Sequence, residues 1–243
     1  MKLLVVGGGG YVGSIVEQML EREHICTHFD RKPMGHKARS MVGDVTDPLM
    51  AHRAVQDMDS VLYMPLGVRP GTTNDVNDPA VAFDVHVRGF YEFLRAGLKA
   101  GVRRFIYIST MDVYSYKQTQ EHPIREQMPA AAFSPYGLSK RLGELVGEAA
   151  VQHRPETTVV SARLYMPKND RDWKGSEAQA STRGDYVPGR HPLGPNDTRR
   201  LFAALLAFDR PGYYVFNAAG DPSGEVISHA QSRELLGWQP QGD

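Results

Sequence analysis

The apolar residues of this chain follow two alternating patterns. Short, nearly continuous apolar runs predict buried strands at 2–6, 24–29, 40–45, 60–66, 104–110 and 157–164. Between these runs, apolar residues at helical spacing predict helices over 11–22, 47–58, 80–100 and 134–152. Strands that are apolar throughout and alternate with helices are typical of a parallel sheet covered on both faces. We therefore predict an α/β fold with a doubly wound parallel sheet.

The composition is ordinary for a globular protein and excludes several functional classes. The 243 residues suffice for one large domain, and 41% of them are hydrophobic. Because 28 basic residues balance 28 acidic ones, we expect no nucleic-acid partner. The single cysteine, Cys26, excludes an internal disulfide, and the histidines form no recognisable metal motif, so we expect no metal site. No apolar run suits a membrane span, and residues 3–6 are too few for a signal peptide, which predicts a cytoplasmic protein without a membrane partner.

Glycines occupy the point where the first predicted strand should turn into a helix. The sequence GGGGYVG places Gly7, Gly10 and Gly13 at regular spacing across this turn. A side chain there would obstruct the tight turn, the approach of a phosphate to the backbone, or the packing of helix on strand. The helix N-terminus then offers unpaired N–H groups and partial positive charge to a diphosphate. A plain tight turn is the alternative, but strand, helix and an acidic residue about 20 positions later favour a dinucleotide site.

Asp30, at the end of the second predicted strand, is that acidic residue. Its carboxylate can accept hydrogen bonds from both hydroxyls of an adenosine ribose. It would also repel a 2′-phosphate, by about 3 kcal/mol at ~5 Å and an effective dielectric of ~20. Asp30 therefore favours NAD over NADP. Arg31 and Lys32 could hold a 2′-phosphate if Asp30 turned away, which keeps NADP as the less favoured alternative.

A second set of polar residues follows the strand predicted at 104–110. Thr110 ends that strand, where ligands meet an open parallel sheet. Tyr136 and Lys140 are four residues apart, so they share one face of the helix predicted at 134–152. A tyrosine that exchanges protons at neutral pH needs its pKa lowered from about 10, and we expect the neighbouring ammonium to contribute to that shift. A hydroxyl at Thr110 would bind the same substrate oxygen.

With both sets in view, the chain resembles the extended short-chain dehydrogenase/reductase superfamily, in its NAD-dependent epimerase/dehydratase branch. The matching segments span nearly the whole chain: GGGGYVGS (7–14), FDRKP (29–33), GDVTD (43–47), AGVRRFIYISTMDVY (100–114), PYGLSK (135–140), ARLY (162–165), YVFNAAGD (214–221) and RELLGWQP (233–240). The resemblance implies a Rossmann-type fold and NAD as cofactor.

The resemblance also assigns roles by position. Thr110 matches the catalytic Ser/Thr, Tyr136 the proton donor or acceptor, and Lys140 the lysine that also binds the nicotinamide ribose. The implied cofactor contacts are Gly7, Gly10, Tyr11, Val12, Gly13, Asp30, Arg31, Asp44, Val45, Met64, Pro65, Leu66, Lys140 and Tyr165.

Three departures from the family pattern bear on the substrate. His86 stands where the family commonly has asparagine, and Met166 stands where sugar-nucleotide enzymes have an asparagine that contacts the substrate diphosphate. Only about 80 residues follow the last predicted strand. We therefore predict an NAD-binding domain at 1–164 and a reduced substrate-binding portion at 165–243 of the same compact unit. A smaller substrate is favoured over a nucleotide sugar, with His86 and Met166 as candidate contacts.

The stretch 166–195 lacks a regular pattern and is long for a loop. Such loops are usually functional or disordered. Arg171, Arg183 and Arg190 are candidate cations for a substrate carboxylate or phosphate, with the stretch acting as a lid. Solvated charges on a surface loop are the alternative.

Two classes of function remain. The first is an NAD-dependent oxidoreductase that acts on a carbinol or carbonyl centre of a small polar, sugar-like molecule through Thr110, Tyr136 and Lys140; a sugar-nucleotide epimerase or dehydratase is the competing enzyme. The second is an NAD(P)-binding regulator without turnover, which would need Lys140 but not Tyr136. The complete Thr-Tyr-Lys set favours an enzyme.

The helices predicted at 80–100 and 134–152 are apolar on more than one face, whereas a helix that covers a sheet needs one apolar stripe. The resemblance implies dimerisation through these two helices. We therefore predict a closed, two-fold homodimer. Cover from another part of the same chain is the alternative.

Overall fold

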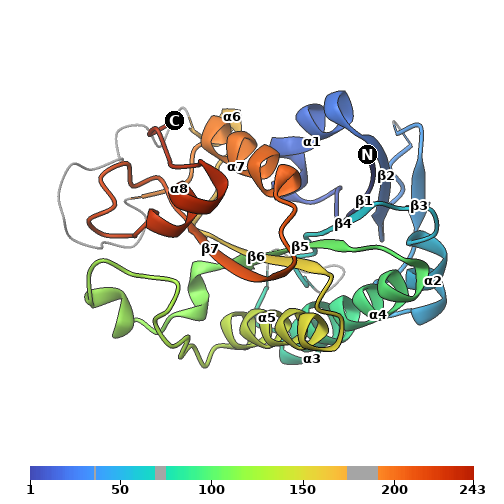
Figure 1. The fold of residues 1–243 in the computed structure, drawn as a ribbon, viewed down its shortest axis with the longest axis horizontal. Coiled ribbons are helices and arrows are strands. Elements are labelled where there is room, and N and C mark those ends of the chain that lie inside the picture. Colours follow the sequence, from blue (N-terminus) through green and yellow to red (C-terminus); the bar gives the residue numbers. More distant parts are fainter. Residues whose placement is uncertain (36, 69–74, 174–190) are drawn as a thin grey trace.

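A parallel sheet forms the centre of the computed structural model, which describes residues 1–243 except 36, 69–74 and 174–190 (Figure 1). Within the described residues, the sheet has seven strands in the order β3-β2-β1-β4-β5-β6-β7. The strands are β1 (Lys2–Val6), β2 (Ile25–Asp30), β3 (Ser40–Val42), β4 (Ser60–Tyr63), β5 (Arg104–Thr110), β6 (Thr158–Leu164) and β7 (Gly212–Ala218). All the strand pairs are parallel, so the protein has the predicted Rossmann-type α/β fold.

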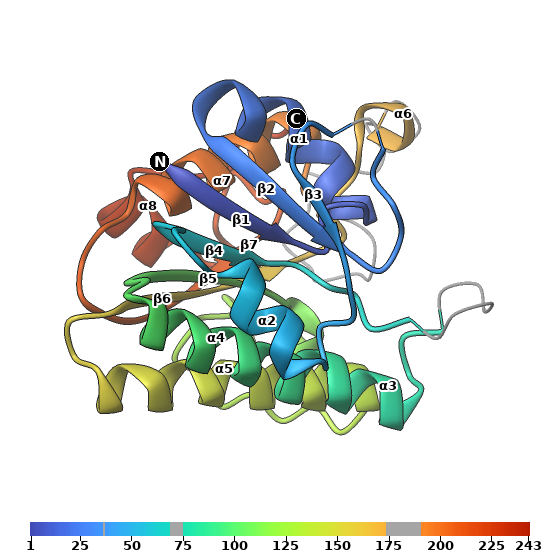
Figure 2. The same cartoon turned by 90° about the vertical axis from the view of Figure 1, so that its right-hand side faces the viewer.

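Helices cover both faces of the sheet (Figure 2). One face carries α1 (Tyr11–Glu23), α7 (Pro195–Ala207) and α8 (Ala230–Leu236). The other carries α2 (Pro48–Ala54), α3 (Pro79–Phe83), α4 (Phe90–Ala100) and α5 (Pro135–His153). Each face has its own apolar core, because alternate residues of every strand point to opposite sides: Leu3 and Val5 belong to one core, Leu4 and Val6 to the other. No helix in the described part of the chain is both long and apolar enough to cross a bilayer.

Short polar and proline signals define where the helices begin. Asp47 accepts a hydrogen bond from the Leu49 N–H and is followed by Pro48 at the start of α2. Ser134 caps α5 in the same way, by accepting a hydrogen bond from the Gly137 N–H. Helix α5 therefore begins just before Tyr136, whose hydroxyl contacts Thr110 at the end of β5.

The long helix predicted over 80–100 is interrupted. A π-helical segment, η1 (Asp84–Gly89), separates α3 from α4. Two buried tyrosines from the sheet reach it: the Tyr63 hydroxyl donates to the Val85 carbonyl at 2.6 Å, and the Tyr107 hydroxyl lies 3.3 Å from the His86 carbonyl. Both hydroxyls thus contact carbonyls of the π-helical segment. The helical periodicity of the sequence did not indicate this interruption.

Two predicted strands are shorter than expected, and one was missed. β3 ends at Val42 and β4 at Tyr63, since Gly43 and Pro65 follow them and turn the chain away. β7 pairs with β6 from Thr158↔Gly212 to Leu164↔Ala218, so residues after 165 extend the same sheet. Short helices lie in the connections: η2 (Met111–Val113), η3 (Gln118–Gln120) and α6 (Asp170–Trp173).

Candidate active site

The predicted polar residues gather at the carboxyl edge of the sheet. The strand order places β1 beside β4, and the chain runs outward from this pair in both directions, which makes it the switch point of the sheet. The glycine-rich turn follows β1, the segment 64–67 follows β4, and Thr110 ends β5. Ligands of open parallel sheets bind in the crevice at such a point.

The glycine-rich turn leaves no room for side chains. Gly7 has φ +78°, and a Cβ there would lie 2.8 Å from the Pro65 nitrogen. A Cβ on Gly13 would lie 2.0 Å from the Gly8 carbonyl oxygen, so helix α1 packs directly on the turn. Helix α1 begins after Gly10 with no side-chain cap and no acidic residue in its first turn. Its first N–H groups suit the diphosphate of a dinucleotide.

Asp30 lies against this turn. One carboxylate oxygen accepts from the Gly9 N–H at 3.0 Å and the other from the Lys32 N–H at 3.1 Å. A carboxylate has further lone pairs, so these bonds leave capacity for ribose hydroxyls. The Arg31 guanidinium donates to the Val68 carbonyl at 2.8 Å, which directs it to the chain after β4.

The remaining predicted cofactor residues differ in their exposure. Asp44 is exposed and accepts from the Thr46 hydroxyl, whereas Val45 is buried. Leu66 is 43% exposed and Met64 is buried. Tyr165 is buried in a small apolar cluster with Met111, Ile124 and Val226. Its ring therefore packs inside the protein.

Lys140 is buried at the carboxyl edge of the sheet. Its ammonium donates to the Ile108 carbonyl at 2.8 Å and to the Pro65 carbonyl at 3.2 Å, and it lies 5.0 Å from the centre of the Tyr107 ring. Burial lowers the pKa of Lys140 to about 7, against an opposing effect of the Glu144 carboxylate. Lys140 thus joins α5 to the ends of β4 and β5.

Tyr136 and Thr110 are in contact. Burial and the nearby Asp112 carboxylate raise the pKa of Tyr136 to about 12, while a hydrogen bond with the Thr110 side chain acts in the opposite direction. The expectation that Lys140 would lower this pKa is therefore wrong for the protein without cofactor, because the ammonium is directed to backbone carbonyls. In this state Tyr136 carries its proton at neutral pH.

The candidate substrate residues divide into three groups. His86 is fully buried and both its ring nitrogens contact protein groups, Ser139 Oγ at 2.8 Å and the Leu66 carbonyl at 2.9 Å, so it has no nitrogen left for a substrate. Met166, with φ +42°, and Arg171 are exposed, and Arg171 pairs with the adjacent Asp172. The predicted contacts Arg183 and Arg190 lie outside the described residues.

The α6 segment contacts the start of α1. The Tyr11 hydroxyl donates to the Asp172 carboxylate at 2.7 Å and accepts from the Asn169 N–H at 3.1 Å. Tyr11 thus joins the glycine-rich turn to the stretch predicted as a lid.

A buried charge network behind the site was missed by sequence reasoning. Arg163 on β6 forms two hydrogen bonds with Glu144 on α5, at 2.8 and 2.7 Å, and both side chains are nearly inaccessible. The Ser109 hydroxyl donates to the same carboxylate at 2.7 Å, and Arg163 also donates to the Tyr114 hydroxyl. An arginine inside the otherwise apolar run TTVVSARL was the available signal.

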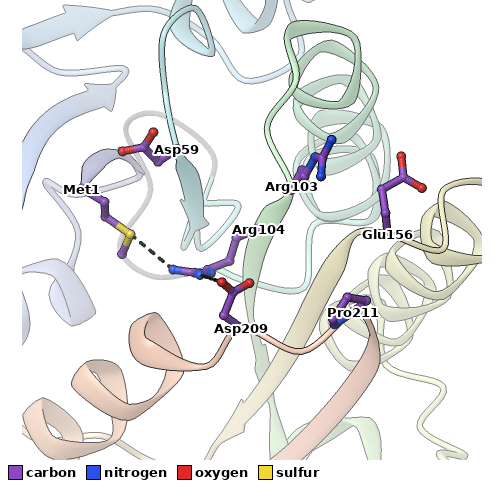
Figure 3. A pocket seen from close by; sticks show the side chains of 7 residues that line it. All are labelled: Met1, Asp59, Arg103, Arg104, Glu156, Asp209 and Pro211. Carbon is purple, nitrogen blue, oxygen red and sulfur yellow. Dashed lines mark hydrogen bonds and ion pairs between the residues drawn. The ribbon is translucent and has the colours of Figure 1, made fainter.

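A cavity of about 510 Å³ lies at the opposite, amino edge of the sheet (Figure 3). It is lined by Met1, Asp59, Arg103, Arg104, Glu156, Asp209 and Pro211. Arg104 and Asp209 on its wall pair with each other at 2.9 Å. The predicted catalytic residues lie at the other ends of these strands. In the described part of the chain no group of three or more His, Cys, Asp or Glu residues could hold a metal ion.

Known proteins resemble the chain over its full length. A model of the NAD dependent epimerase/dehydratase family matches residues 3–168. A UDP-glucose 4-epimerase from Streptococcus mutans is 24% identical over 316 aligned positions, which cover 100% of this chain and 93% of that enzyme. The alignment is longer than the chain, so the relative has segments that this chain lacks.

Two solved structures illustrate the similarity of fold. A mutated uronate dehydrogenase superposes with a TM-score of 0.78 at 23% identity, covering 99% of this chain and 81% of that one. A short-chain dehydrogenase/reductase superfamily protein from Agrobacterium tumefaciens, crystallised with bound NAD, gives a TM-score of 0.77 at 21% identity over 99% and 93%.

Proposed function

The chain belongs to the NAD dependent epimerase/dehydratase family, and from this premise we propose that it is an oxidoreductase acting on a carbinol or carbonyl centre of a small, polar, sugar-like substrate. The observation that carries the proposal is the placement of Thr110 and Tyr136 in contact at the end of β5, next to the glycine-rich turn. A protein that only binds a dinucleotide has no use for this pair.

The residues at the switch point fit NAD. The N–H groups at the start of α1 would hold the diphosphate, and Asp30 would accept from the adenosine ribose. Lys140 would donate to the nicotinamide ribose from its place beneath Pro65. When bound, NAD supplies the acceptor or donor of a hydride at the carbon that carries the substrate oxygen.

Tyr136 would move the proton that accompanies this hydride. Its hydroxyl would donate a proton to a carbonyl oxygen during reduction, which leaves the phenolate, and in oxidation the phenolate would receive the proton of the substrate alcohol. Thr110 holds the same oxygen by a hydrogen bond and thereby fixes its distance from Tyr136. Oxidation requires a lower pKa at Tyr136 than in the free protein, and the positive charge of oxidised nicotinamide acts in that direction.

Met166 supports a small substrate. The Met166 side chain cannot donate a hydrogen bond to a diphosphate, and one of the structures of similar fold is named as a uronate dehydrogenase. A sugar-nucleotide epimerase is the second candidate, favoured by the match to 93% of the length of the streptococcal UDP-glucose 4-epimerase.

Turnover measurements separate these candidates. We expect NADH formation when the protein and NAD are mixed with a panel of uronic acids and related sugars. Interconversion of UDP-glucose and UDP-galactose without net NADH formation would instead assign the epimerase. Binding of NAD without turnover of any of these uronic acids, sugars or UDP-sugars would contradict an enzymatic role.

A homodimer remains part of the proposal, with a revised surface. Phe90 and Phe93 are fully buried within the chain itself, so they are not available to a partner. Helices α4 and α5 are neighbours on one face of the sheet (Figure 2), and each keeps an accessible apolar side chain: Tyr91 on α4 is 50% exposed and Leu145 on α5 is 40% exposed. Sedimentation should give twice the 27.0 kDa chain mass, and Leu145→Glu should shift the protein to the monomer; a 27.0 kDa species at all concentrations contradicts the dimer.

A further inference from the structure

His86 is fully buried and connects the chain after β4 to helix α5. It lies in the π-helical segment η1, between α3 and α4 along the chain. Its Nε2 is 2.9 Å from the Leu66 carbonyl oxygen, and its Nδ1 is 2.8 Å from Ser139 Oγ. Its ring also packs edge-on against Tyr136, with ring centres 5.6 Å apart.

The two contacts determine the tautomer of the ring. A carbonyl oxygen can only accept, so the proton must lie on Nε2 and be donated to Leu66. Nδ1 then carries a lone pair directed at Ser139 Oγ, whose single hydroxyl proton has two acceptors within reach, His86 Nδ1 at 2.8 Å and the Tyr136 carbonyl at 3.0 Å. Burial and the nearby Lys140 ammonium hold the pKa of His86 well below its ordinary value, so the ring stays neutral and this arrangement persists.

The same short segment is held from three directions. Lys140 donates to the Pro65 carbonyl while His86 donates to the next carbonyl, that of Leu66. Gly7 lies against the other side of Pro65, where even a Cβ would come within 2.8 Å of its nitrogen. The segment 64–67 is thus clamped between the glycine-rich turn and helix α5.

Gly67 shows how closely the ring is fitted. It has φ +74°, and a Cβ at this position would lie 2.9 Å from His86 Nε2. The close approach of the His86 ring to Leu66 therefore needs a glycine at 67, which links two positions that are distant in sequence.

We propose that His86 is a positioning residue that fixes segment 64–67 relative to Tyr136 and so sets the distance between the nicotinamide and the proton-transfer group. This role rests on the proposed function, because segment 64–67 borders the nicotinamide only if NAD binds at the switch point. His86 does not touch the reacting atoms; it acts through Leu66 and Ser139.

Three variants remove the contacts selectively. His86→Phe keeps the volume of the ring and loses both hydrogen bonds, and His86→Gln keeps a donor for Leu66. Ser139→Ala removes the Nδ1 partner together with the hydrogen bond from Ser139 to the Tyr136 carbonyl. His153→Phe, which makes the same replacement at an exposed histidine of α5, is the matched control. Each variant is titrated with NADH while the fluorescence of the reduced nicotinamide is recorded, and the melting temperature verifies the fold.

We expect His86→Phe to lose most of the nicotinamide fluorescence change while its Kd for NADH rises by less than about tenfold, since the diphosphate and adenosine contacts are distant. With the substrate found by the turnover panel, kcat should fall by about 10²-fold with KM little changed, because a misplacement of about 1 Å has this effect on a reacting pair. His86→Gln should recover part of both signals, and Ser139→Ala should lie between His86→Phe and the wild type.

The outcomes are distinguishable. Failure of the wild type to bind NADH overturns the proposed function itself. Binding by the wild type with an unchanged nicotinamide signal in a folded His86→Phe overturns the positioning role. If His86→Phe does not fold, His86→Gln and Ser139→Ala decide: signals equal to those of His153→Phe in both overturn the role, and graded losses support it. NMR of the ring nitrogens that places the proton on Nδ1 would also contradict it.

Discussion

The two sides of the carboxyl edge of the sheet are built from different groups. Beside β1 and β2, the main chain supplies the site: glycines leave space, and the uncapped start of α1 offers N–H groups. Beside β5 and β6, buried side chains supply it: Lys140, Glu144 and Arg163 are each at most 2% exposed. The first side needs small residues at fixed spacing, whereas the second needs charged partners brought from α5, β5 and β6.

This difference predicts different sensitivities to mutation. N–H groups remain when a side chain is replaced, so the cofactor side tolerates most changes that add no volume. A buried charge is stable only with its partner, and removal of one member leaves the other unpaired away from water. Single replacements should therefore have their largest effects beside β5 and β6.

The largest effect is expected at Arg163. Arg163→Met leaves the Glu144 carboxylate buried without its bidentate partner, which should lower the free energy of unfolding by about 3–5 kcal/mol. Arg141→Met is the matched control, because Arg141 contacts the same carboxylate from a position that is 30% exposed, and about 1 kcal/mol or less is expected. Urea unfolding measures the free energy of unfolding of both variants. Equal decreases in the two variants would show that the burial of the Arg163–Glu144 pair does not determine its contribution to stability.

The next effect concerns activity rather than stability. Tyr136→Phe removes the proton donor, so kcat on the substrate identified by the panel should fall by about 10²-fold or more while NAD affinity changes little. Tyr116→Phe, at a side chain that is 73% exposed, should behave as the wild type. Near-normal turnover by Tyr136→Phe would remove Tyr136 from the mechanism.

The pH dependence of stability tests Lys140. Its pKa falls from 10.5 to about 7 on folding, so the unfolded chain binds more protons than the folded one between these values. The free energy of unfolding of the protein without NAD should therefore rise with pH in this window, by about 1.4 kcal/mol per pH unit from this residue. Below about pH 7 both states are protonated and the contribution no longer changes.

Lys140→Met should lack this dependence. The difference between the unfolding free energies of the wild type and Lys140→Met is measured at several pH values, so that the other titrating groups cancel. A difference that stays constant from about pH 7 to pH 10 would show that Lys140 keeps its ordinary pKa in the fold.

The smallest effect is expected on the cofactor side. NAD(H) should bind at least tenfold more tightly than NADP(H), which corresponds to about 1.4 kcal/mol, and Asp30→Ala should reduce this preference. Asp209→Ala, at the opposite edge of the sheet, should leave it unchanged. Equal affinities in the wild type would mean that Arg31 and Lys32 outweigh Asp30.

Predictions from the sequence were confirmed where a structural feature depends on residues close together in the chain. The six predicted strands exist, and the spacing of Gly7, Gly10 and Gly13 falls at the turn into α1. The interruption of the helix at 84–89 was not predictable from periodicity, since hydroxyls of Tyr63 and Tyr107, which bind its carbonyls, come from separate strands. β7 was missed: it lies at the edge of the sheet and its first four residues are only partly buried, so it lacks the continuous buried run of the inner strands.

The sequence by itself determined the alternation of the first six strands with helices, the glycine-rich turn and the candidate groups for moving a proton. These follow from local periodicity and from spacing along the chain. Only the tertiary structure decided that His86 faces Leu66 and Ser139, that Lys140 is directed to the Pro65 and Ile108 carbonyls, and that Glu144 pairs with Arg163. The physical reason is burial: a polar group removed from water must find a partner among whatever groups the fold brings beside it, and those groups are distant in sequence.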